Sequence, residues 1–158
     1  MKNVTIALIV ATSCLLAFTS NKPQRMDNPP HKTTVSPMEG AWELYSTEAK
    51  GKTTYHKKPK QIKVYQDNNF CMMHYDTTGK FYYACAGTYE LDGNRYKETF
   101  IYHSMAAFTG ASIWYDWSAN GDTLTFAGFK KILSPDGKDV TQDWGGDYFI
   151  EKKVRVKK

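Results

Sequence analysis

The sequence predicts an all-β protein whose folded part is a small antiparallel β-barrel of about eight strands. After residue 39, no segment has the apolar spacing of an amphipathic helix, and short runs of alternating apolar and polar residues are separated by turn signals instead. This part has about 120 residues, a usual size for one domain. Aromatic residues make up 15% of the chain, with 11 tyrosines, which provides enough apolar surface for a core.

The expected strands follow from alternation and from the turns between them. About eight strands of such length can close a barrel that is filled by side chains or encloses one small ligand. The predicted strands are Gly40–Ser46, Gln61–Gln66, Phe70–Tyr75, Lys80–Leu91, Asn94–His103, Ala111–Ser118, Thr123–Phe129 and Asp147–Val156.

The first 20 residues have the pattern of a secretory signal peptide. Lys2 gives a positive start, an apolar run covers Val4–Phe18, and polar residues follow. The apolar run is shorter than the roughly 20 residues of a membrane-spanning helix. We therefore expect export to the periplasm or beyond, and an uncleaved anchor or lipoprotein processing at Cys14, where Ala-Thr-Ser-Cys is similar to a lipobox, are the alternatives.

Residues 21–38 are expected to form a short disordered tether before the barrel domain, residues 39–156. The segment contains Pro23, Pro29, Pro30 and Pro37 and few apolar residues, so it cannot bury enough surface to offset the entropy of ordering it.

The formal net charge of +5 is partly carried by a basic C-terminal tail, residues 152–158. Because an exported protein does not meet nucleic acid, we expect this tail to be a solvated end.

Three turn signals set the expected register of the hairpins. Asp76-Thr77-Thr78-Gly79 suits a three-residue loop, whereas Asp92-Gly93 and Asn120-Gly121 are typical of two-residue turns. Because a slip of one residue would invert both faces of a strand, the inner face depends on these turns. The predicted cross-strand pairs are Cys71 with Cys85, Tyr89 with Tyr96, Cys85 with Phe100, Trp117 with Leu124, and Tyr115 with Phe126.

The inner face of this arrangement is aromatic and contains one carboxylate, Glu98. That carboxylate could bind an amine or hydroxyl of a ligand, or it could make a structural hydrogen bond to a tyrosine or to water. The rings could line a cavity or could simply fill the barrel. The candidate ligand-binding residues are Tyr83, Tyr96, Glu98, Phe100, Tyr115, Trp117 and Phe126.

The outer face is predicted to carry charge, because Lys63, Glu90, Lys97 and Asp116 are assigned to it. Charges at these positions exclude a barrel embedded in lipid.

Cys71 and Cys85 are the cysteines that remain after the signal peptide, and an even number in an exported chain favours a disulfide between them. Two buried thiols are the alternative.

The start of the barrel resembles the lipocalin fingerprint, because Gly40-Ala41-Trp42 opens the first strand. Residues 39–155 are most similar to bacterial lipocalin-like domains of unknown function, which share a GTWxL-like start (residues 40–44), a hairpin like residues 87–98 and a late GDxL (residues 121–124). The resemblance implies a barrel of eight to ten strands and, for many relatives, an apolar ligand. It transfers the fold better than the function.

Lipocalins also place an arginine of the last strand across the fingerprint tryptophan. Arg155 is the late candidate, but it shares its face with Phe149 and Glu151, whereas Tyr148, Ile150 and Val154 look more like a buried set. The sequence therefore does not support this contact.

No catalytic constellation is visible. The histidines at 31, 56, 74 and 103 lack the spacing of metal ligands, and neither a G-x-S-x-G motif nor a phosphate loop occurs. We expect no enzyme activity, no metal and no cofactor. The sequence favours an exported protein that binds a small hydrophobic or aromatic molecule inside the barrel, and the alternative is a non-catalytic interaction module of the cell envelope whose barrel is filled.

Overall fold

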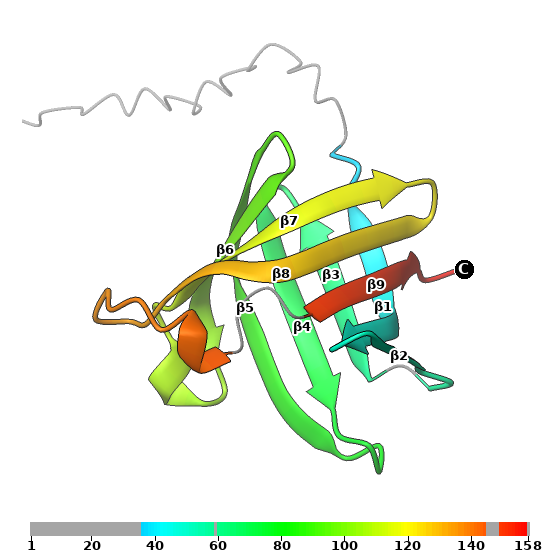
Figure 1. Cartoon of the computed structure of the whole chain (residues 1–158), viewed down its shortest axis with the longest axis horizontal. Helices are drawn as coiled ribbons and strands as arrows, with labels where there is room; N and C mark the ends of the chain where they lie inside the picture. Colours follow the sequence, from blue (N-terminus) through cyan, green and yellow to red (C-terminus); the bar gives the residue numbers. More distant parts are fainter. Residues whose placement is uncertain (1–35, 59, 145–148, 158) are drawn as a thin grey trace, which may run out of the picture. The chain divides into compact units, whose positions relative to one another are not determined.

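The computed structural model describes residues 36–58, 60–144 and 149–157. The expected signal peptide, Cys14 and most of the expected tether lie outside the described residues. In the described part the chain forms nine strands and two short 3-10 helices (Figure 1). These are β1 (Gly40–Ala49), β2 (Lys52–Tyr55), β3 (Gln61–Gln66), β4 (Asn69–Tyr75), β5 (Phe81–Asp92), β6 (Arg95–His103), η1 (Ala106–Phe108), β7 (Ser112–Asn120), β8 (Thr123–Leu133), η2 (Gln142–Trp144) and β9 (Phe149–Arg155).

Eight strands close an antiparallel barrel. The order is β1-β3-β4-β5-β6-β7-β8-β9, and β9 pairs back with β1. β2 adds a ninth strand as a hairpin on the far half of β1. The all-β, up-and-down barrel that the sequence predicted is therefore confirmed. β2 was not expected, and it forms because Lys50 and Gly51 both adopt positive φ and turn the chain back onto β1.

The register of two hairpins differs from the expectation by one residue on each strand. Tyr89 pairs with Glu98 rather than Tyr96, and Trp117 pairs with Phe126 rather than Leu124. The reason is that Gly93 and Gly121, with φ of +57° and +54°, occupy the first position of each turn rather than the second. Both strands shift together, so the inner face stays the same.

The predicted disulfide is wrong. Cys71 lies opposite Ala86, and Met72 lies opposite Cys85, so the two cysteines are on opposite faces of the sheet. An extra residue in β5, Tyr82, forms a bulge near the β4–β5 turn and moves one strand by one position. Both thiols are free, with Cys71 exposed and Cys85 buried.

One end of the barrel is closed by Trp42, which is 0% exposed. Its indole Nε1 donates a hydrogen bond of 2.7 Å to the carbonyl oxygen of Met38. The guanidinium of Arg155 lies 4.1 Å from the ring centroid, and Nη1 donates to the Glu39 carbonyl oxygen at 2.7 Å. Gly40 has φ of +115°, and a Cβ there would lie 2.7 Å from Nη1 of Arg155. The tryptophan–arginine contact that the sequence did not support is therefore present.

Two strands carry the opposite face assignment from the one predicted. In β9 the charged residues Glu151, Lys153 and Arg155 point inward. In β3 the side chain of Lys63 is buried, so its assignment to the outer face is wrong. Hydrophobicity is a poor guide to the inner face of these two strands, because several of their inward side chains are charged or polar. Both strands pair with β1.

Glu90, Lys97 and Asp116 do lie on the outer face. Lys97 donates to Glu90 across the β5–β6 hairpin at 2.9 Å. Asp116 lies 3.2 Å from the guanidinium of Arg95 on β6. These are ion pairs on a solvated face of the sheet, where each pair contributes little to stability.

Candidate functional site

The barrel encloses a cavity of about 270 Å³ between the closed end and the opposite mouth. Strands β3–β9 and the segments around η1 and η2 contribute its wall. Most of the wall is aromatic. The aromatic lining consists of Tyr65, Tyr82, Tyr83, Tyr96, Phe100, His103, Phe108, Tyr115, Phe126, Phe129, Trp144 and Phe149.

Six of the seven candidate residues lie together in this wall. They are Tyr83, Tyr96, Glu98, Phe100, Tyr115 and Phe126. Trp117 lies apart from the cavity, and its indole Nε1 donates to the carbonyl oxygen of Gly93 at 3.1 Å. Trp117 therefore braces the β5–β6 turn instead of contacting the cavity.

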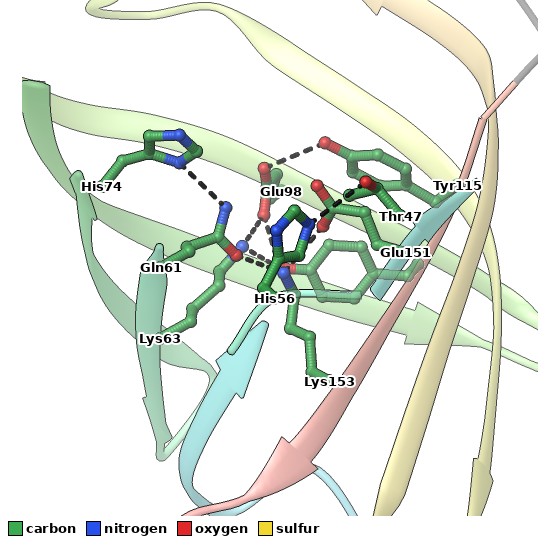
Figure 2. Close-up of polar contacts among 10 residues, drawn as sticks. Thr47, His56, Gln61, Lys63, His74, Glu98, Tyr115, Glu151 and Lys153 are labelled. Carbon is green, nitrogen blue, oxygen red and sulfur yellow. Dashed lines mark hydrogen bonds and ion pairs between the residues drawn. The ribbon is translucent and has the colours of Figure 1, made fainter. Parts of the chain in front are cut away.

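Glu98 forms a buried ion pair with Lys63 in the cavity wall, and the two side chains are 3% and 5% exposed. The carboxylate oxygen that meets Lys63, Oε2, also accepts a hydrogen bond of 2.7 Å from the Tyr96 hydroxyl. The other oxygen, Oε1, accepts from the Tyr115 hydroxyl at 3.3 Å. Figure 2 shows Lys63 and Tyr115 pointing toward Glu98. The carboxylate is therefore oriented by three side chains from three strands.

Aromatic rings surround the ammonium group of Lys63. Its Nζ lies 4.2 Å from the Phe70 ring centroid and 5.3 Å from that of Tyr65, which suits cation–π attraction. Burial disfavours the ammonium, but the carboxylate of Glu98 outweighs it and raises the pKa of Lys63. Burial also raises the pKa of Tyr96 and Tyr115, with Glu98 adding to the effect. At neutral pH this part of the cavity therefore holds a charged lysine and neutral tyrosines.

A second ion pair, Lys153 with Glu151, lies on β9 at 2.7 Å. Lys153 is 3% exposed and Glu151 is 22% exposed. The Lys153 ammonium also donates to Oε1 of Gln61, whose amide nitrogen lies 3.5 Å from Nδ1 of His74 (Figure 2). Burial would raise the pKa of Glu151, but Lys153 lowers it below the usual value. Burial lowers the pKa of Lys153 in spite of Glu151.

One side of the cavity region is a stack of three rings. The Tyr83 ring lies parallel to His74, with centroids 4.9 Å apart and an interplanar angle of 4°. On its other side His103 stacks at 5.1 Å and 20°. Burial lowers the pKa of both histidines, which favours neutral imidazoles at pH 7. The three stacked rings are therefore uncharged near neutral pH.

The mouth of the cavity is also aromatic. Trp144 of η2 packs edge to face against Phe108 and Phe129, with centroids 5.4 and 6.1 Å away. Phe149 stacks on Phe129 at 4.5 Å. Tyr82 and Trp144 are 59% and 41% exposed, so the wall extends to the surface here. A ligand that enters at this end would meet apolar rings before it meets the charged residues.

Sequence reasoning missed the residues Lys63, Gln61, Glu151 and Lys153. A signal for two of them was present, because the fingerprint tryptophan implies an inward arginine. Counting back from Arg155 in steps of two places Lys153 and Glu151 on the same inner face. In β3 no such marker exists, because Ile62 and Val64 are more apolar than the residues that point inward.

Within residues 36–58, 60–144 and 149–157, no three His, Cys, Asp or Glu side chains are arranged to hold a metal ion. No helix in these ranges is long and apolar enough to cross a membrane.

Comparisons with known proteins give structural neighbours only. No family model matches the chain, and no curated protein matches it. A lipocalin-like protein from Bacteroides uniformis is similar with a TM-score of 0.47 and 10% identity, over 76% of this chain and 99% of that one. An uncharacterized protein from Bacteroides eggerthii has a TM-score of 0.43 and 13% identity, over 73% and 98%. The closed eight-strand barrel and the Trp42–Arg155 contact of this chain are those of a lipocalin-like fold.

Proposed function

We propose that this protein is an exported, non-catalytic binding protein that holds a small aromatic or hydrophobic molecule inside its barrel. The cavity itself carries the proposal. It has a volume of about 270 Å³, aromatic walls, and charged side chains that are held in defined positions. Ligand sites of proteins generally combine an apolar wall with a few placed polar groups.

The cavity volume supports a small ligand. An apolar cavity of roughly 150 Å³ holds a benzene molecule, and drug-sized ligands occupy roughly 300–1,000 Å³. A cavity of about 270 Å³ therefore suits a molecule of one or two rings. A long acyl chain would have to extend through the mouth into solvent.

The same volume argues against the alternative of an interaction module with a filled barrel. A barrel of eight strands can be filled completely by its own side chains. Here the large residues stay in the wall instead. Tyr83 is held there by its histidine stack, and Phe129 by its contact with Phe149.

The cavity chemistry supports binding rather than catalysis. The described residues that line it include no serine, threonine or cysteine. The candidate acids are already in ion pairs with Lys63 and Lys153, and the histidines are stacked on Tyr83. A serine, threonine or cysteine nucleophile with an adjacent base is therefore not found in the described wall.

Native mass spectrometry of the mature protein, purified from the envelope of its own organism, tests the proposal directly. We expect a reproducible extra mass that is lost on extraction with organic solvent. The extracted compound would identify the ligand class. A bare protein mass, together with the absence of binding in the titration described next, would contradict the proposal.

Isothermal titration with 2-naphthol as the probe gives a second test. Tyr96→Phe removes the hydroxyl that donates to Glu98 at 2.7 Å and helps to orient this carboxylate in the cavity wall. We therefore expect the variant to bind 2-naphthol about fivefold to tenfold more weakly. Tyr102→Phe is the matched control, because Tyr102 also lies on β6 but is 72% exposed. Equal losses in the two variants would show that the cavity is not the binding site.

A further inference from the structure

The charged groups in the cavity wall balance one another. We propose that this balance makes the cavity selective for an uncharged aromatic ligand with a hydrogen-bond donor, such as a phenol, over an aromatic acid or amine of the same size. The inference rests on the proposed function and names its ligand class.

The charge balance comes from two closed pairs. Among the described residues that line the cavity, the ammonium groups belong to Lys63 and Lys153, and the carboxylates belong to Glu98 and Glu151. Each lysine contacts one of these carboxylates, with Lys63 on Glu98 and Lys153 on Glu151. A pair of this kind has zero net charge whether the shared proton sits on the nitrogen or on the oxygen. The sum over the wall is therefore zero for either arrangement.

The imidazoles at the cavity do not alter this sum at neutral pH. His103 lines the cavity, and His74 reaches it through Gln61. Both are stacked on Tyr83, and burial lowers the pKa of each. A low-polarity wall of rings therefore surrounds two neutral ion pairs.

A charged ligand would disturb these pairs. A carboxylate could gain a cation only by taking Lys63 or Lys153 from its present partner. That exchange leaves Glu98 or Glu151 as a buried charge without a counterion, which is strongly unfavourable. An amine meets the same difficulty with the opposite sign. A neutral ligand leaves both pairs intact.

A neutral donor has an acceptor ready in the wall. On Glu98, Oε2 is shared by Lys63 and Tyr96, whereas Oε1 accepts a single longer bond of 3.3 Å from Tyr115 within the described residues. An ionised carboxylate oxygen can accept two hydrogen bonds. A phenolic hydroxyl could therefore donate to Oε1 while its ring packs among the aromatic side chains.

The test compares three naphthalene probes of similar size by isothermal titration near pH 7. The probes are 2-naphthol, which is neutral, 2-naphthoate, which is an anion, and 2-naphthylmethylamine, which is a cation. We expect 2-naphthol to bind the full mature protein about tenfold or more tightly than either charged probe. Equal or tighter binding of 2-naphthoate would overturn the inference.

Two variants change the charge of the cavity by one unit in opposite directions. Glu151→Gln gives a net positive wall, so the ratio of 2-naphthoate to 2-naphthol affinity should rise about tenfold. Lys153→Gln gives a net negative wall, and the ratio for 2-naphthylmethylamine should rise instead. Glu90→Gln, on the outer face with a side chain that is 68% exposed, is the matched control and should change neither ratio.

The outcomes separate this inference from the proposed function. If none of the probes binds and native mass spectrometry shows the bare protein mass, the proposed function fails. If none binds but a charged aromatic molecule co-purifies, only the inference fails. If all three bind equally, and Glu151→Gln leaves their ratio unchanged, the cavity binds ligands but the charge balance does not select them. If a variant does not fold, the ratio measured for the unaltered protein still decides.

Discussion

The two halves of the barrel interior are built from the same strands but are packed in opposite ways. At the closed end, Trp42 is fully buried, its indole nitrogen has a backbone acceptor, and Arg155 covers its ring. In the other half, the wall leaves about 270 Å³ open and holds two ion pairs. The first arrangement stabilises the barrel, and the second leaves room for a ligand.

The change from one half to the other occurs within single strands. Along β9, steps of two residues lead from Arg155 at the closed end to Lys153 and Glu151 in the cavity wall. Inner positions of one strand can therefore pack the closed end and, a few residues away, line the cavity. Substitutions at the two ends should have different consequences.

The largest effect is expected at the closed end. Trp42→Ala removes a fully buried ring and its contact with Arg155, so the free energy of unfolding should fall by about 4–5 kcal/mol. The ratio of 2-naphthol to 2-naphthoate affinity should stay the same, because the cavity wall is untouched. Urea denaturation measures the first quantity and titration calorimetry the second. A loss below about 2 kcal/mol would show that this end is not the main stabilising element.

The next effect concerns the buried pair in the cavity wall. Lys63→Met leaves Glu98 without its cation and should lower the free energy of unfolding by about 3–4 kcal/mol. In the double variant Lys63→Met with Glu98→Gln, at least half of this loss should be recovered, because no unpaired charge remains. Urea denaturation of the three proteins gives the coupling energy.

An outer ion pair provides the control for that experiment. Lys97 contacts Glu90 at 2.9 Å, but the Glu90 side chain is 68% exposed. Lys97→Met should therefore change the free energy of unfolding by less than about 1 kcal/mol. Similar losses for the inner and outer lysines would contradict the distinction between the polar interior and the solvated face.

A smaller effect is expected for Arg155→Lys. The lysine keeps the charge but lacks the planar guanidinium of Arg155. It therefore cannot lie flat on Trp42 and donate to Glu39 and Asp122 at the same time. We expect a loss of about 1–2 kcal/mol in thermal or urea unfolding. Arg95→Lys, an exposed arginine paired with Asp116, should lose less. The reverse order would assign the closed end a smaller role than its burial indicates.

The smallest effect depends on pH. Burial would raise the pKa of Glu151, but Lys153 lowers it below its usual value of 4.5. A depressed folded-state pKa adds stability above the unfolded-state value, and that stability is lost as the pH falls through the folded-state value. The difference in unfolding free energy between the unaltered protein and Glu151→Gln should therefore be largest near neutral pH and shrink as the pH falls below 4.5. A difference that grows with acidity would contradict this assignment.

The strand pattern was readable because turns and alternation are local. The glycines at 93 and 121 mark two hairpins, and the faces of β5 and β6 follow from their alternation. Register could not be read to the residue, because a glycine can take either central position of a two-residue turn. The bulge at Tyr82 left no mark in the sequence, and it alone separated Cys71 from Cys85.

By itself, the sequence determined the all-β barrel, its eight strands, the Gly40–Trp42 start and part of the aromatic wall, because each of these depends on neighbours along the chain or on one alternating face. Only the tertiary structure decided that Lys63 and Lys153 point inward and find Glu98 and Glu151. Lys63 and Glu98 are 35 residues apart in the chain, and a buried charge is stable only beside a partner that closure of the barrel supplies. The inward position of Lys63 was therefore settled only by the closed barrel.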